Sequence, residues 1–132
     1  KKLFEKTKYE VGMSTGDLDG SSKHLERYDV LILTVEKMDS LLRHKCSWVE
    51  DIQCLVIDEI HLLNDVSRGP TLEILITLLK HIKKQMQLIG LSATIGNPEE
   101  LAEWLGAELV IDDWRPVKLH KGIYFEDSVE FY

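Results

Sequence analysis

The chain has 132 residues, of which 44% are hydrophobic and 30% are charged, a balance typical of one folded domain and not of a disordered segment. Its formal net charge of −7 argues against a general electrostatic grip on nucleic acid, although hydroxyls and backbone amides can still contact phosphates. The apolar runs are too short to span a bilayer, and the lysine-rich start is not a signal peptide. Cys46 and Cys54 fit neither a disulfide framework nor a zinc spacing, so we expect a cytoplasmic protein without a membrane partner.

Apolar strands alternate with helical segments along the first half of the chain. Tyr9 to Thr15 is predicted to be a strand, and the glycine-rich loop from Gly16 to Gly20 follows it. The apolar run from Val30 to Leu33 is typical of a strand covered on both faces, and a helix should follow from about Val35 to Arg43. Cys54 to Ile57 is predicted to be the third strand.

The second half continues this alternation. Pro70 suits the first turn of a helix whose apolar residues recur at helical spacing, and Gln87 to Leu91 is predicted to be a fourth strand. Asn97 to Glu100 combines an N-cap residue, a proline and a glutamate in the order typical of a helix start. Leu109 to Ile111 and Val117 to Phe125 are further strand candidates. The pattern predicts an α/β fold with a mainly parallel sheet flanked by helices.

Polar residues stand where the predicted strands end. Asp58 and Glu59 directly follow one strand, Thr34 follows another, and Ser92 follows a third. Ligands of open parallel sheets bind beyond such strand ends. One carboxylate there can hold Mg²⁺ through its water shell, while the other orients and deprotonates a water that attacks a phosphate. The same two acids can equally cap the next helix, because negative charge stabilises a helix N-terminus.

The order and spacing of the motifs resemble those of the superfamily-two DExH helicases. Asp58-Glu59-Ile60-His61 and Ser92-Ala93-Thr94 resemble motifs II and III, and "TVEKMDSLLRH" resembles motif Ib of the superkiller-like group. Three longer stretches are most similar to the archaeal repair-helicase branch, relatives of the helicase lobe of DNA polymerase theta: "DEIHLLNDVSRGPTLE", "LSATIGNPEELAEWLGAELV" and "DDWRPVKL". The resemblance covers nearly the whole chain and implies part of a RecA-like lobe of the P-loop NTPase type.

The resemblance implies a role for each matching residue. Asp58 is expected to hold the Mg²⁺ of bound ATP through water, and Glu59 is expected to be the catalytic base. His61, Ser92 and Thr94 are expected to couple the state of the γ-phosphate to the grip on nucleic acid. The positions expected to contact nucleic acid are Gly16, Asp17, Thr34, Glu36 and Lys37.

Two assignments stay open at this point. Gly16 and Gly20 also fit an ordinary turn. Arg68, in the stretch "SRGP", fits a phosphate contact or a structural salt bridge.

The phosphate-binding sequence G-x-x-x-x-G-K-[ST] does not occur in these 132 residues. The family places that loop upstream and a second RecA-like lobe downstream. We therefore expect residues 1–116 to be the C-terminal portion of a first lobe, and residues 117–132 to lead toward a second lobe in cis. Mg²⁺ and ATP are expected to bind only the intact protein, and the isolated chain should be inactive. A sheet without the phosphate-loop strand should leave an uncovered edge beside Gln87 to Leu91, which favours self-association.

The resulting hypothesis is a fragment of an ATP-dependent DNA helicase that translocates on single strands, with a role in DNA repair or replication-fork processing. A superkiller-like RNA helicase is an alternative, because motifs II and III do not read the sugar. A non-catalytic nucleic-acid-binding or scaffold module is another. A metallohydrolase built on Asp58, Glu59 and His61 is disfavoured, because the carboxylates are sequence neighbours and no second histidine follows at helical spacing.

Overall fold

The computed structural model describes residues 4–14, 22–112 and 114–132. The chain divides into two compact units, the first ending at Gly96 and the second running from Asn97 to Tyr132. Gly16 and Asp17, which the sequence predicts to contact nucleic acid, lie outside the described residues. Within the described ranges, every helix is too short or too polar to cross a lipid bilayer.

The strands of the first unit form parallel pairs. β1 (Val11–Ser14) pairs with β2 (Val30–Leu33), and β3 (Cys54–Ile57) pairs with β4 (Gln87–Gly90). The predicted α/β fold with parallel strands is therefore confirmed, and β2 and β3 have the predicted bounds. The single continuous sheet is not observed, because no hydrogen-bonded ladder joins β2 to β3 in the part of the chain that the structure describes.

The helices of the first unit begin where their sequence signals lie. α1 (Val35–Arg43) has the predicted bounds and is capped by Thr34, whose Oγ1 accepts a hydrogen bond from the Lys37 backbone N–H at 3.2 Å. α2 (Gly69–Ile82) carries Pro70 in its first turn, where a missing N–H costs nothing. Short 3₁₀ helices complete the unit: η2 (Ser22–Leu25), η3 (Ser47–Asp51) and η4 (Ile60–Asn64).

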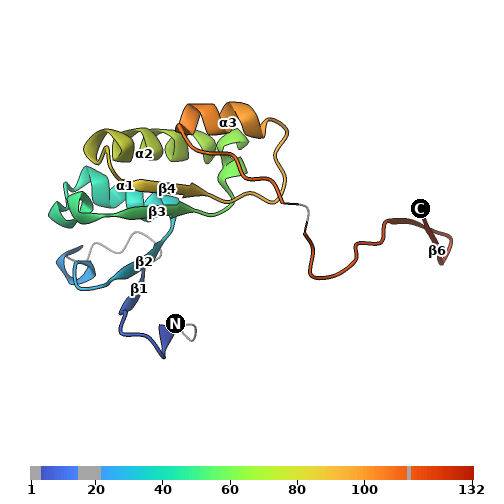
Figure 1. Ribbon diagram of the computed structural model, residues 1–132, viewed down its shortest axis with the longest axis horizontal. Coiled ribbons are helices and arrows are strands. Elements are labelled where there is room, and N and C mark those ends of the chain that lie inside the picture. Colours follow the sequence, from blue (N-terminus) through green and yellow to red (C-terminus); the bar gives the residue numbers. More distant parts are fainter. Residues whose placement is uncertain (1–3, 15–21, 113) are drawn as a thin grey trace. The chain divides into compact units, whose positions relative to one another are not determined.

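Helices α1 and α2 pack against each other and supply most of the core of the first unit. Figure 1 shows α2 lying along the β3–β4 pair. Leu79 is 1% exposed, and Leu55 of β3 packs against the cluster that contains it. The buried members of this cluster are Leu25, Met38, Leu41, Trp48, Val49, Leu75 and Leu79. One face of the parallel strands is therefore covered by helices.

The other face of these strands is open. Met13 and Ile32 are register partners and are 70% and 50% exposed, while the partners Val56 and Ile89 are 55% and 37% exposed. The prediction that the strand Val30–Leu33 is covered on both faces is thus wrong for this chain, because Ile32 is exposed. Side chains alternate between the faces of a strand, and the described helices of the first unit cover one face only.

Helix α3 (Pro98–Leu105) begins the second unit at the predicted place. Asn97 precedes it, but its Nδ2 donates a hydrogen bond to Glu100 Oε2 at 2.8 Å and its side chain does not cap the backbone. Gly106 ends the helix in the left-handed conformation, with φ of 63°. The predicted strand from Leu109 to Ile111 is not observed, because those residues form no ladder in the described part of the chain and Val110 is 82% exposed.

An antiparallel hairpin of β5 (Gly122–Phe125) and β6 (Ser128–Phe131) ends the second unit. The predicted strand from Val117 to Phe125 is therefore shorter, and β6 was not predicted. The connecting residues Glu126 and Asp127 have φ of 44° and 59°. Such a turn is normally signalled by Asn-Gly or Asp-Gly, and Glu-Asp gives no such signal.

Candidate functional site

Backbone hydrogen bonds join the ends of β3 and β4 beyond the strands themselves. The Leu91 N–H donates to the Ile57 carbonyl at 2.9 Å, and the Ile60 N–H donates to the Leu91 carbonyl at 2.9 Å. These bonds bracket Asp58 and Glu59 on one chain segment and place them beside the segment that enters Ser92. The expectation that the motif II and motif III residues share one edge of the sheet follows directly from this parallel register.

Glu59 adopts a left-handed backbone conformation, with φ of 53° and ψ of 45°. Few residues other than glycine adopt it, because Cβ approaches the following carbonyl oxygen. The bend lets Ile60, which is 2% exposed, pack over the end of β4, where a Cβ added to Gly90 would lie 2.8 Å from Ile60 Cδ1. The turn therefore buries the isoleucine and leaves both neighbouring carboxylates exposed to solvent.

The structure shows no side-chain capping hydrogen bond at Glu59. Glu59 occupies the N-cap position of η4, yet its side chain accepts no capping hydrogen bond. Asp58 Oδ1 accepts the adjacent Glu59 N–H at 3.0 Å. The Glu59 carboxylate, 53% exposed, is instead directed at the His61 ring, with Oε2 lying 3.3 Å from Nδ1.

His61 connects the two strand ends. Its Nδ1 lies 3.2 Å from Ser92 Oγ as well as 3.3 Å from Glu59 Oε2. A protonated Nδ1 can donate to the carboxylate, whereas an unprotonated Nδ1 can only accept from the serine hydroxyl. His61 Nδ1 therefore either donates a hydrogen bond to the Glu59 carboxylate or accepts one from the Ser92 hydroxyl, depending on whether Nδ1 carries the proton.

The Asp58 carboxylate lies at the same strand end as Glu59. Its carboxylate is exposed, and one of its oxygens already accepts the Glu59 amide. The described residues contain no cluster of three or more metal-ligating side chains. Mg²⁺ commonly keeps several waters and takes only one or two protein carboxylates together with substrate phosphates, so a single carboxylate is the kind of ligand that the sequence hypothesis requires of Asp58.

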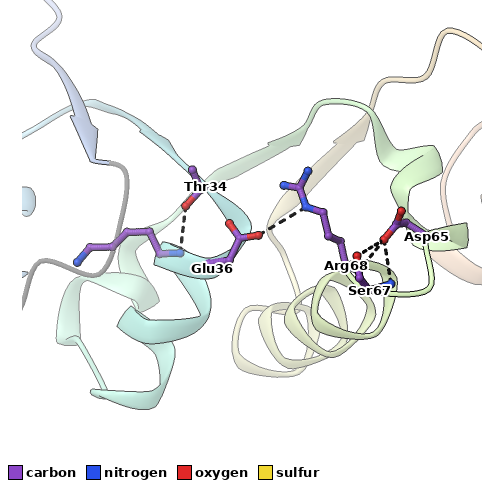
Figure 2. A network of polar contacts seen from close by, with 6 residues as sticks. Thr34, Glu36, Asp65, Ser67 and Arg68 are labelled. Carbon is purple, nitrogen blue, oxygen red and sulfur yellow. Dashed lines mark hydrogen bonds and ion pairs between the residues drawn. The ribbon is translucent and has the colours of Figure 1, made fainter.

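The residues predicted to contact nucleic acid at the start of α1 already have partners within the unit. Thr34 Oγ1 caps the helix, and Lys37 is only 7% exposed, which is unusual for a lysine. Glu36 Oε1 lies 3.5 Å from Arg68 Nε, as Figure 2 shows. Of the two possibilities left open for Arg68, the structure therefore shows the salt bridge. Thr94 is exposed, and among the described residues its hydroxyl forms no hydrogen bond to His61.

Asp65 organises the turn between η4 and α2, and the sequence interpretation missed it. Its Oδ1 accepts hydrogen bonds from Ser67 Oγ at 2.6 Å, from the Arg68 N–H at 2.8 Å and from the Ser67 N–H at 2.9 Å. These bonds, with the Ser67 hydroxyl first, lower the pKa of Asp65. The turn is fully formed above the ordinary carboxyl pKa and weakens as the pH falls through the lowered value. An aspartate just before a serine and a helix start is the signal that could have identified it.

Residues 1–101 of this chain match the family DEAD/DEAH box helicase. The chain belongs to this family. It is 54% identical over 131 residues to the ATP-dependent DNA helicase Hel308 of Methanocaldococcus jannaschii, covering 99% of this chain and 11% of that protein. It is likewise 54% identical over 128 residues to Hel308 of Pyrococcus abyssi, covering 97% of this chain and 18% of the relative. Hel308 of Methanococcus vannielii is 52% identical over 130 residues, covering 98% of the chain and 17% of the relative.

These matches confirm the predicted resemblance to DExH helicases and to their archaeal repair-helicase branch. The chain spans 11% to 18% of the length of these three relatives. This segment of a DEAD/DEAH box helicase thus contains the acidic pair, the histidine and the serine that the structure brings to one edge.

Proposed function

We propose that the intact protein is an ATP-dependent DNA helicase that moves along single strands and unwinds duplexes during DNA repair or fork processing in the cytoplasm. The observation that carries the proposal is His61 Nδ1, which lies 3.3 Å from the Glu59 carboxylate and 3.2 Å from the hydroxyl of Ser92, just beyond β4. This arrangement places a carboxylate, an imidazole and a hydroxyl at a sheet edge where ligands bind. The similarity to proteins named as ATP-dependent DNA helicases supports the same function.

Each residue has a distinct chemical role in this proposal. The Glu59 carboxylate orients the attacking water and accepts its proton. Asp58 holds Mg²⁺ through a water, and bound Mg²⁺–ATP supplies the phosphoryl group and the charge neutralisation. His61, with Ser92 and Thr94, couples the state of the γ-phosphate in the ATP site to the binding of nucleic acid. Thr34, Lys37 and the loop at Gly16 and Asp17 contribute to nucleic-acid binding.

The exposed apolar side chains of β1 to β4 support the proposal that further parts of the intact protein pack on these strands. Parallel sheets are normally buried on both sides, and here four apolar register partners are exposed on one side. We propose that the rest of the first RecA-like lobe covers this face. A second lobe in cis then completes the ATP site, and residues 117–132 lead toward it.

Single-stranded DNA should stimulate the ATPase of the intact protein more strongly than RNA of the same length and sequence. The measurement is the steady-state rate of phosphate release across a concentration series of each nucleic acid at fixed salt, because phosphate contacts are salt-dependent. Stronger stimulation by RNA would favour the superkiller-like alternative. Absence of stimulation by both, together with absence of ATP turnover, would favour a non-catalytic module.

The isolated chain should self-associate. In the described residues β4 forms a ladder with β3 only, and Val56 and Ile89 leave an apolar surface beside the unpaired edge. Sedimentation velocity over a concentration series should show a rising weight-average mass, and the double change Val56→Lys and Ile89→Lys should suppress it. The control is Val66→Lys, at a side chain that is 95% exposed outside any strand. A strict monomer at high concentration would contradict this prediction.

A further inference from the structure

Arg68 connects the segment that follows the acidic pair to the start of α1, which is distant in sequence. In the proposed function the first segment serves ATP hydrolysis and the second serves nucleic-acid binding. Its backbone N–H donates to Asp65 Oδ1 at 2.8 Å, and its guanidinium Nε lies 3.5 Å from Glu36 Oε1 (Figure 2). Arg68 directly precedes α2, while Glu36 lies in the first turn of α1, and these two helices pack against each other. The side chain therefore bridges the starts of two helices.

The backbone of Arg68 is tied to the segment that begins at the acidic pair. The Asp65 N–H donates to the Leu62 carbonyl of η4 at 3.0 Å, and the Gly69 N–H donates to the Asp65 carbonyl at 2.8 Å. Asp65 also holds Ser67 and Arg68 through its side chain. Because η4 begins directly after Glu59, these hydrogen bonds form a short, continuous connection between the acidic pair and Arg68.

Glu36 is a poor candidate for a direct contact with nucleic acid. Its carboxylate would be repelled by a phosphate, although it stabilises the N-terminus of α1. The Thr34 hydroxyl, two residues before it, is neutral and can donate to a phosphate. The geometry gives Glu36 a different task, which is to hold the Arg68 guanidinium beside the first turn of α1.

We propose that the Glu36–Arg68 ion pair is a positioning contact that links the segment after the acidic pair to the start of α1. It thereby sets how strongly nucleic acid stimulates ATP hydrolysis. This inference rests on the proposed helicase function. The arginine and glutamate side chains are 48% and 57% exposed, so the pair can break and re-form as the two helix starts move. A contact that is either formed or broken can couple two sites. For an exposed ion pair we expect this coupling to change the stimulation of ATP hydrolysis by about two- to fivefold.

A charge exchange in the intact protein tests the contact. The variants are Arg68→Glu, Glu36→Arg and both together, with Arg68→Lys as a milder change. Each is assayed for ATPase kcat with and without saturating single-stranded DNA, and for the DNA concentration that gives half-maximal stimulation. We expect each single reversal to lower the ratio of stimulated to unstimulated kcat by about two- to fivefold, and the exchange to restore most of it. Arg68→Lys should retain more than half of the wild-type ratio.

Arg43 provides the matched control. Its Nε pairs with Asp39 Oδ2 at 2.8 Å within α1, so Arg43→Glu breaks a closer ion pair of the same kind that joins no second element. We expect it to leave the stimulation ratio at the wild-type value. An equal loss in this variant would overturn the proposal, because the effect would then reflect helix charge alone.

The remaining outcomes separate this inference from the proposed function. Reversal at Arg68 that raises the half-maximal DNA concentration and is not corrected by the exchange would show a direct phosphate contact and overturn the ion-pair proposal. Unchanged ratios in both single variants would also overturn it and leave the helicase function intact. A wild-type protein without ATP turnover or nucleic-acid stimulation would overturn the proposed function itself.

Discussion

Replacing Glu59 with glutamine should lower the ATPase kcat of the intact protein by about 10²- to 10⁴-fold, the usual contribution of a positioned general base. Glutamine keeps the length and shape of the side chain but cannot accept a proton from water. Because the Glu59 carboxylate is exposed and makes no capping hydrogen bond, its loss should not disturb η4. The measurement is the steady-state rate of phosphate release with saturating Mg²⁺, ATP and single-stranded DNA.

The Glu59→Gln variant should still bind nucleotide and single-stranded DNA, since neither interaction needs the proton acceptor. Glu73→Gln is the control, because it makes the same chemical change on the exposed surface of α2, away from the strand ends. Full activity in Glu59→Gln would remove the catalytic base from the proposal. Loss of DNA binding to the same extent as loss of turnover would indicate a structural role for Glu59.

Replacing Gly69 with alanine should destabilise the chain by about 1–3 kcal/mol, the usual cost of forcing an extra carbon into a filled site. An added Cβ would collide with the Leu63 carbonyl oxygen and lie 2.9 Å from its carbonyl carbon. Both atoms belong to the backbone of η4, so relief requires moving the segment that follows the acidic pair. The better helix propensity of alanine offsets only part of this cost. Urea-induced unfolding followed by circular dichroism measures the change.

Gly96→Ala is the matched control for Gly69→Ala. A Cβ added at Gly96 would meet nothing within 4 Å, so this change should alter the free energy of unfolding by less than about 1 kcal/mol. Both substitutions restrict the unfolded chain in the same way, and their difference therefore isolates the steric clash. Equal unfolding midpoints for the two variants would show that the turn after η4 adapts without cost.

Local signals in the sequence predicted the elements that hold the site. The helical spacing after Leu33 gave the bounds of α1, and the apolar runs gave the bounds of β2 and β3. The parallel order of the strands was enough to bring the acidic pair beside Ser92. These features depend on residues close in sequence or on one topological rule, which is why they can be derived without a structure.

Other features depend on contacts between distant residues and gave no local signal. Nothing near Glu36 or Arg68 in the sequence specifies that they meet, because α1 and α2 must pack first. The burial of Lys37 likewise depends on packing around α1. The hairpin was missed because Glu126 and Asp127 adopt positive φ without the residue types that usually mark such a turn.

The left-handed backbone at Glu59 has a consequence for protein engineering. A side chain in that conformation costs about 1 kcal/mol or more relative to glycine, so the wild-type residue is not the most stable choice at its position. A library screened only for thermal tolerance would enrich glycine there and discard the carboxylate. If Glu59 has the proposed catalytic role, residue 59 should be held fixed in any stabilisation of this helicase segment, because that role needs a carboxylate whereas the backbone conformation favours glycine.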